Sequence, residues 1–220
     1  MAVTEPGGPN RVQGRRNPEQ VKADILAVAT AEFAERGLEA ASVNEIASKT
    51  ATTKRMIYYY FTSKEGLYTA VLERSYRQMA ETLLREADPA DLDPVDALRR
   101  LAEKTFDHHD THREYVRLVV GENMLRGAYI RRAGELRELW APMLDAIADI
   151  LRRGREQGSI RDDVDPIDVQ VLINSFSLFH ITNQYTFDAL YGYALDGAET
   201  RAHLRRMIGD AAVRTFGVVG

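Results

Sequence analysis

The sequence predicts an all-α protein in which a small N-terminal head is joined to a larger C-terminal body. Apolar residues recur with the roughly 3.6-residue period of a helix almost everywhere, and no segment alternates convincingly as a β-strand does. Residues that favour helix starts precede several of these stretches. A chain of 220 residues is long enough for one large domain or two small ones with hydrophobic cores. We therefore expect helices packed on helices throughout.

The first helix is expected to begin at Asn17 and to stop at Gly37. Asparagine is a good N-cap, and Pro18 takes the first helical position, where its missing N–H is not needed. Gln20 stands where a capping box places a glutamine. One apolar stripe then follows along the helix: Val21, Ile25, Val28, Ala29 and Phe33. Glycine supplies the left-handed residue that commonly ends a helix.

Two short helices joined by a tight turn come next. Residues 42–45 have the pattern of a capping box, so we expect a helix from there to about Lys49. Residues 50–52 interrupt it, and a third helix starts at Thr52 or Thr53. Such a pair has helix-turn-helix proportions, and the second helix of that motif enters the major groove of DNA. Basic and tyrosine residues also occur on ordinary solvated helices, so the pattern alone leaves both interpretations open.

The rest of the chain is expected to form longer helices. Ser63 caps a helix that ends near Ala87, and a loop with acids and prolines follows. Further helices are expected over residues 94–109, 113–125, 139–157, 166–187 and 200–216. We divide the chain into a flexible basic arm (1–16), a helix-turn-helix head (17–66) and a dimerisation and ligand-sensing body (67–220).

Composition narrows the possible functions. The absence of cysteine removes disulfides, thiolate zinc sites and cysteine nucleophiles. The net charge is −4, but residues 46–64 contain no acid and four basic residues: Lys49, Lys54, Arg55 and Lys64. No apolar run approaches the ~18 residues of a membrane span, and the N-terminus lacks the apolar region of a secretory signal. We expect a cytoplasmic protein without a cofactor and without membrane contact.

The stretch SVNEIASKTATTKRMIYYYFTSKEGLYTAVL, from Ser42 to Leu72, resembles the DNA-binding head of the tetracycline-repressor (TetR) family. The resemblance covers residues 18–72, and its most specific part is IYYYFTSKEGLY, from Ile57 to Tyr68. It implies a regulator that binds double-stranded operator DNA. It assigns phosphate contacts to Lys54, Tyr58, Tyr59 and Lys64, and places Thr52, Thr53 and Arg55 near the bases. We add Ser42, at the start of the preceding helix, to the candidate DNA contacts.

The chain departs from the family pattern at three positions. Ala51 stands where the family usually has glycine in the turn, and a left-handed alanine would be strained by ~1–2 kcal/mol, so a different turn is expected. Arg55 replaces a commonly small residue and can bind guanine bidentately, while Tyr60 replaces a common histidine. The arm before the first helix contains Arg11, Arg15 and Arg16. It either follows the minor groove or serves as a solubilising tail.

Two C-terminal helices are expected to pair with a second copy of the chain. The segment 169–181 is apolar all round, so it must be covered on both faces. The resemblance implies that the last two long helices form a four-helix interface in a homodimer; the alternative is a core helix of a monomer. The candidate interface residues are Leu172, Leu204, Ile208, Ala211, Ala212 and Thr215, with Phe216 on the same stripe.

A ligand sensor also needs a cavity between the middle helices. Aromatic residues with a few amides and imidazoles suit a flat, partly polar organic effector, although such residues are more often plain core. The candidate lining residues are Phe106, His109, Asn123, Met124, Trp140, Phe176, Phe179, His180 and Asn183.

His108 and His112 are spaced i, i+4 and could hold a metal if one helix ran through both, but a polar helix end is the favoured interpretation. A metal-assisted hydrolase and a helical interaction module are the alternative functions. No nucleophile triad, phosphate loop or dinucleotide-binding glycine motif supports an enzyme. The sequence therefore favours a ligand-responsive transcriptional regulator, most simply a dimeric repressor of a palindromic operator that a small molecule releases.

Overall fold

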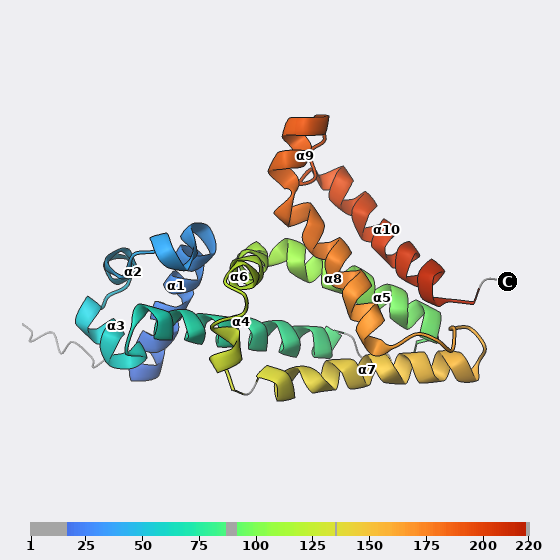
Figure 1. Cartoon of the computed structure of the whole chain (residues 1–220), viewed down its shortest axis with the longest axis horizontal. Coiled ribbons are helices and arrows are strands. Elements are labelled where there is room, and N and C mark those ends of the chain that lie inside the picture. The colour runs from blue at the N-terminus through green and yellow to red at the C-terminus, as the bar shows by residue number, and fades with distance from the viewer. Residues whose placement is uncertain (1–16, 87–91, 135, 219–220) are drawn as a thin grey trace, which may run out of the picture.

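The computed structural model describes residues 17–86, 92–134 and 136–218. Within these ranges the chain forms ten α-helices, one 3-10 turn and no β-strand; an isolated bridge pairs Ile160 with Gly217. The predicted all-α fold is thus confirmed. Figure 1 shows a head at one end of the long axis and a larger body at the other. The arm residues Arg11, Arg15 and Arg16 lie outside the described residues.

The head consists of three helices packed on the first half of a fourth. These are α1 (Pro18–Ala40), α2 (Val43–Lys49), α3 (Lys54–Phe61) and α4 (Lys64–Glu86). Their apolar faces meet in one core, whose fully buried side chains are Ile25, Ala29, Ile46, Ile57, Leu67, Val71 and Leu72. This packed core stabilises α2 and α3, which at seven and eight residues are too short to persist alone.

The predicted helix ends agree with the structure in most places. The Asn17 side chain accepts from the Glu19 N–H at 3.1 Å, and Gly37 kinks α1 with a φ of +69° before a further turn ends at Ala40. Ser63 Oγ caps α4 by accepting from the Gly66 N–H at 3.0 Å.

The turn between α2 and α3 differs from the left-handed glycine turn of the family, as the sequence predicted. Among the described non-glycine residues only Thr62 and Arg126 have positive φ, so Ala51 is not left-handed. The Thr50 hydroxyl donates instead to the carbonyl of Ile46 at 2.9 Å and ends α2 without a glycine.

The body contains six helices and a second hydrophobic core. They are α5 (Pro94–Thr111), α6 (Arg113–Met124), α7 (Leu136–Glu156), α8 (Pro166–Thr182), α9 (Gln184–Tyr191) and α10 (Ala198–Phe216), with the 3-10 turn η1 (Ile130–Arg132) before α7. The second half of α4 lies along α7, and α8 and α10 pack on α5, as Figure 1 shows. α4 therefore belongs to both parts of the molecule.

One expectation about the body helices is wrong. Residues 166–187 do not form one helix, because Asn183 separates α8 from α9; its amide donates to the Phe179 carbonyl at 3.3 Å and to the Thr182 hydroxyl at 2.8 Å. The favoured interpretation of His108 and His112 as a polar helix end agrees with the structure: the helix that contains His108 ends at Thr111, and His112 lies at the junction with α6.

The body also completes the core of the head. Leu118 of α6 is 1% exposed and belongs to the same buried cluster as Ile25 and Leu72. On the surface beside it, the Arg117 guanidinium pairs with Glu35 of α1 at 2.7 Å. The head is therefore joined to the body by α6 as well as by α4.

Candidate nucleic-acid interface and ligand cavity

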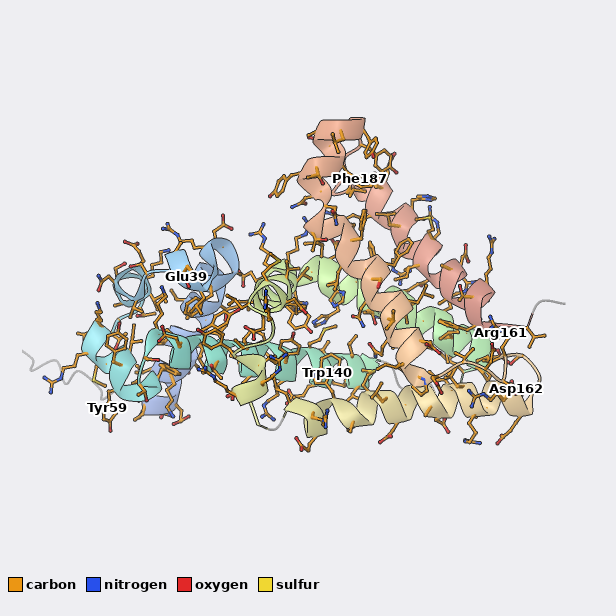
Figure 2. All side chains as sticks on the ribbon, viewed as in Figure 1. Glu39, Tyr59, Trp140, Arg161, Asp162 and Phe187 are labelled. Carbon is orange, nitrogen blue, oxygen red and sulfur yellow. The ribbon has the colours of Figure 1, made fainter. Side chains whose placement is uncertain are left out.

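The outer face of α3 is polar and exposed. Thr53 is its N-cap, and its hydroxyl accepts from the Met56 N–H at 3.3 Å. Lys54 and Arg55 follow in the first turn and are exposed, while Ile57 points inward and is fully buried. Tyr59 is 76% exposed and lies at the end of the molecule far from the body (Figure 2). The helix thus anchors itself through one face and presents the other to a partner.

The candidate phosphate-binding residues surround this face. The Lys54 ammonium lies 5.8 Å from the centre of the Tyr58 ring, which is also partly exposed. Lys64, at the start of α4, donates to the Glu39 carbonyl at the end of α1, at 2.8 Å. Ser42 Oγ accepts from the Glu45 N–H at 3.4 Å and so begins α2. Thr52 is half-buried in the turn.

This surface can bind a nucleic-acid backbone. The segment of α3 contains two cations, three phenols and no acid, so nothing on it repels phosphates. Cations and hydroxyls are the groups that contact phosphate oxygens, and the N-terminal residues of such a helix reach base edges. Of the described candidate DNA-binding residues, Thr52, Thr53, Lys54, Arg55, Tyr58 and Tyr59 lie on α3 or directly before it, while Ser42 lies at the start of α2 and Lys64 at the start of α4.

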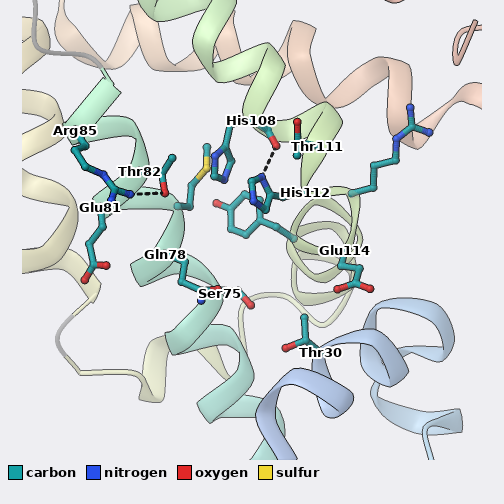
Figure 3. A pocket seen from close by; sticks show the side chains of 13 residues that line it. Thr30, Ser75, Gln78, Glu81, Thr82, Arg85, His108, Thr111, His112 and Glu114 are labelled. Atoms are coloured by element: carbon teal, nitrogen blue, oxygen red, sulfur yellow. Dashed lines mark hydrogen bonds between the residues drawn. The ribbon is translucent and has the colours of Figure 1, made fainter. Parts of the chain in front are cut away.

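A cavity of about 640 Å³ lies between α4 and the junction of α5 with α6. Figure 3 shows the α4 residues Ser75, Gln78 and Thr82 on one side and His108 and His112 on the other. Its remaining lining residues are Thr30, Met79, Glu81, Arg85, Thr111, Arg113, Glu114 and Tyr115. Hydroxyl, amide and imidazole groups thus outnumber apolar ones, and Thr30 comes from the head.

The two histidines of the cavity are stacked, with ring centres 4.1 Å apart. His112 Nδ1 lies 2.9 Å from the His108 carbonyl, which fits an Nδ1–H donor and leaves Nε2 as an acceptor. Burial, and next the neighbouring His112, lowers the pKa of His108 to about 4. The His108 imidazole is therefore neutral at neutral pH and offers hydrogen bonds rather than charge.

The structure does not gather the predicted ligand-binding residues in this cavity. Phe106 and His109 are core residues: Phe106 stacks on His180 at 4.3 Å, and His109 Nδ1 lies 2.8 Å from Ser177 Oγ. Asn123 is exposed and donates to its own helix, at Val119. Asn183, as described above, caps α8.

The other candidates lie in three further places. Met124 is 80% exposed and lines a groove of about 490 Å³ beside the end of α1. Phe176, Phe179 and His180 line a groove of about 560 Å³ between α8 and α10. Trp140 packs edge-on against Tyr76 at 6.2 Å (Figure 2). None of the predicted ligand-binding residues lines the cavity between α4 and the α5–α6 junction, although Ser75, Gln78 and Thr82 recur at helical spacing and form a polar face on α4.

The candidate interface residues also divide into groups. Ile208 and Ala212 are fully buried in the chain's own core, so they pack inside the subunit and cannot contact a partner; this expectation is wrong. Leu172 and Leu204 line the groove between α8 and α10, while Ala211 is half-buried and Thr215 exposed. The exposed apolar residues on these helices are Ile167, Val171, Phe179 and Met207.

No described group of three or more histidine, aspartate or glutamate residues is arranged to hold a metal ion. None of the described helices is both long and apolar enough to cross a membrane. Fold and surface together define a helix-turn-helix protein with a helical body that contains a cavity.

Comparison with known proteins agrees with this class. The family model described as "Bacterial regulatory proteins, tetR family" matches residues 25–71, and "Tetracyclin repressor-like, C-terminal domain" matches residues 94–212. The transcriptional repressor NicS of Pseudomonas putida is 31% identical over 89% of this chain and 92% of its own length. The repressor SCO4008 of Streptomyces coelicolor is also 31% identical, over 72% of this chain and 77% of its own length.

A crystal structure described as that of a transcriptional regulator, SCO4942 of Streptomyces coelicolor, superposes with a TM-score of 0.65. It is 29% identical and covers 89% of this chain and 98% of its own. The chain belongs to the TetR family of transcriptional regulators, and the resemblance seen in the sequence is confirmed. The exposed face of α3 is accordingly the candidate DNA-binding surface.

Proposed function

We propose that this regulator represses transcription by binding a palindromic operator as a homodimer, and that a small organic effector releases it. The face of α3 carries this proposal, because it presents Lys54, Arg55 and Tyr59 to solvent from a helix anchored by Ile57. The relatives named as repressors support the sign of regulation. Such a protein acts where the chromosome is, in the cytoplasm.

DNA binding is tested by measuring affinity for a random-sequence duplex against salt concentration. Each phosphate that a cation neutralises contributes about −0.9 to the slope of log K against log salt. Lys64→Ala is expected to weaken binding to every duplex equally and to reduce the slope by about one. Arg161→Ala, far from the head in Figure 2, is the matched control and leaves the slope unchanged. A wild-type protein with no salt-dependent binding would contradict the proposal.

Pairing through α8 and α10 is the second part of the proposal. Ile167, Val171 and Met207 expose apolar surface there, and exposed apolar surface that a partner covers stabilises a dimer. Ala211→Glu places a charge beside Met207 and should shift the sedimenting species from dimer to monomer. Ala141→Glu, on the exposed side of α7, makes the same change elsewhere and should remain dimeric. A monomeric wild type would refute this part.

The cavity between α4 and the α5–α6 junction is the proposed effector site. Its hydroxyls, its amide and the neutral imidazole of His108 support a partly polar organic ligand that binds through hydrogen bonds. Since Thr30 belongs to the head and His112 to the body, a ligand that touches both has an affinity that depends on how the two parts are placed.

Coupling between the two sites is reciprocal by thermodynamic necessity. If an effector weakens operator binding by ~1–3 kcal/mol, bound operator DNA must weaken the binding of the effector by the same free energy. Compounds are first screened for thermal stabilisation of the protein, because a ligand of the folded state raises its stability. Paired titrations with and without operator then measure the coupling. Equal affinities in the two titrations would exclude that compound as the effector.

A further inference from the structure

A buried carboxylate in the head is not part of the proposed DNA-binding surface. Glu32 of α1 is 4% exposed, and its side chain reaches the next helix. Its Oε1 accepts from the backbone N–H of Ser42 at 3.1 Å, and its Oε2 lies 3.5 Å from the Lys49 ammonium. Ser42 is the N-cap of α2 and Lys49 is its last residue, so one carboxylate holds both ends of this helix.

The contact to Ser42 replaces one half of the capping box that the sequence predicts. In a capping box the N-cap hydroxyl accepts from the third residue of the helix, and the side chain of that residue accepts from the N-cap N–H. Here the first bond is present, at 3.4 Å from the Glu45 N–H to Ser42 Oγ. The N-cap N–H donates to Glu32 instead, and Glu45 is exposed. The start of α2 therefore depends on Glu32 of α1 as well as on its own N-cap, Ser42.

The charge of Glu32 is compensated within the head. Arg36, one turn further along α1, places its Nε 3.4 Å from Glu32 Oε1, and Lys49 lies on the other oxygen. Both cationic side chains are about half exposed, so they remain hydrated while the carboxylate is not. A buried charge is tolerated only when it is paired and hydrogen-bonded in this way.

We infer that Glu32 is a positioning residue for DNA recognition: it holds α2 against α1 and thereby sets the orientation of α3. The transmission is direct, because Ile46 of α2 and Ile57 of α3 are both fully buried in the core of the head. If α2 shifts, the core moves Ile57 with it, and the exposed residues of α3 no longer match the base edges. Glu32 itself touches no DNA in this arrangement. This role depends on the length of the side chain, which lets its oxygen accept from the Ser42 N–H, rather than on its charge.

Two conservative variants separate reach from charge. Glu32→Asp keeps the charge but shortens the side chain by one methylene, so it loses the bond to the Ser42 N–H. Glu32→Gln keeps the reach and the acceptor but loses the charge. The duplex that wild-type protein enriches from a random pool is the specific probe, and the unselected pool is the non-specific one. The ratio of the two affinities measures selectivity, which partial unfolding leaves unchanged because it lowers both affinities equally.

Glu32→Asp is expected to lower selectivity about tenfold, whereas Glu32→Gln keeps it within about threefold of wild type. Hydrogen exchange of the α2 amides should become faster in the aspartate variant only. Glu45→Gln changes the residue that an ordinary capping box would use, and it should change neither quantity.

The opposite order of the two Glu32 variants would assign the effect to charge and overturn the inference. Unchanged exchange in Glu32→Asp would show that α2 is not held by this bond. Faster exchange with unchanged selectivity would show that α2 does not position α3. A wild-type protein that enriches no sequence, yet has the expected exchange pattern, would refute both the proposed operator binding and this role of Glu32, while leaving the bond to α2 intact.

Discussion

The helix α3 of the head and the helices α5 and α10 of the body use their charged residues in opposite ways. On α3 of the head the cations are exposed and have no acid on their own helix. In the body, charges are paired between α5 and α10: Arg99 with Asp210 at 2.5 Å, Arg205 with Glu103 at 2.6 Å and with Asp107 at 2.7 Å, and Asp110 with Arg201 at 3.3 Å. The helix α3 leaves its cations available for a partner, whereas α5 and α10 use their charged residues to hold two helices together.

The two parts nevertheless depend on each other through their cores. The core of the head includes Leu118, which lies far along the chain on α6. The helix α6 begins at the junction where His112 lines the cavity. The comparison therefore indicates that the exposed face of α3 contains no residue of the body, whereas the core of the head does.

The largest expected effect tests this dependence. Leu118→Ala removes a fully buried side chain from the core of the head and should lower the free energy of unfolding by about 2–5 kcal/mol. It should also weaken DNA binding, although Leu118 is no part of the DNA-binding surface. Denaturant unfolding and DNA titration measure the two effects. If stability falls while hydrogen exchange in α1 to α3 is unchanged, the head is independent of α6.

As the pH is lowered, the body should be destabilised before the head. Burial lowers the pKa of His109 to about 3, and that of His108 to about 4. Both values lie below the ordinary value of about 6.5, so the unfolded chain binds protons first as the pH falls. Stability is full well above pH 6.5 and is lost as the pH falls towards these two values, with at most about 2 kcal/mol lost at pH 5 through the deeply buried His109. Denaturant unfolding across this range should show the loss, and His109→Gln should reduce it. An equal loss in the variant would contradict this assignment.

The turn between α3 and α4 is tight, and alanine substitutions at two glycines, one in this turn and one in the body, test how tightly it is packed. A Cβ on Gly66 would lie 2.1 Å from the Phe61 carbonyl oxygen, and Thr62 between them has a φ of +66°. Gly66→Ala must therefore shift the backbone and should cost about 1–3 kcal/mol. Gly134→Ala in the body meets nothing within 4 Å and should be nearly neutral. Thermal unfolding compares the two, and equal effects would show that the turn is not tightly packed.

The smallest effect concerns the surface contact between the parts. The Arg117–Glu35 pair is partly exposed, and such pairs contribute about 0–1 kcal/mol. Arg117→Ala should change stability within that range, and added salt should reduce the difference from wild type. Denaturant unfolding at low and high salt measures it. A loss comparable with that of Leu118→Ala would mean that the ion pair, rather than the core, joins head to body.

The sequence by itself determined the all-α class, most helix starts and the residues on the face of α3. These features depend on neighbours within one or two turns: Thr53 caps α3, Ser63 caps α4, and the period of apolar residues decides that Ile57 faces inward. The candidate DNA-binding residues are close together in the chain, so a local pattern was sufficient to find them.

Only the tertiary structure decided which residues line the cavity, which face of α10 stays free and what starts α2. The cavity joins Thr30, Ser75 and His112 from separate helices, and no local pattern indicates that they meet. Ile208 lies on an apolar stripe, and the sequence of such a stripe does not indicate which surface will cover it. In the structure, α5 of the same chain covers it. The Ser42 N–H donates to Glu32 rather than to the Glu45 side chain, because the packing of α1 against α2 places the Glu32 carboxylate beside it.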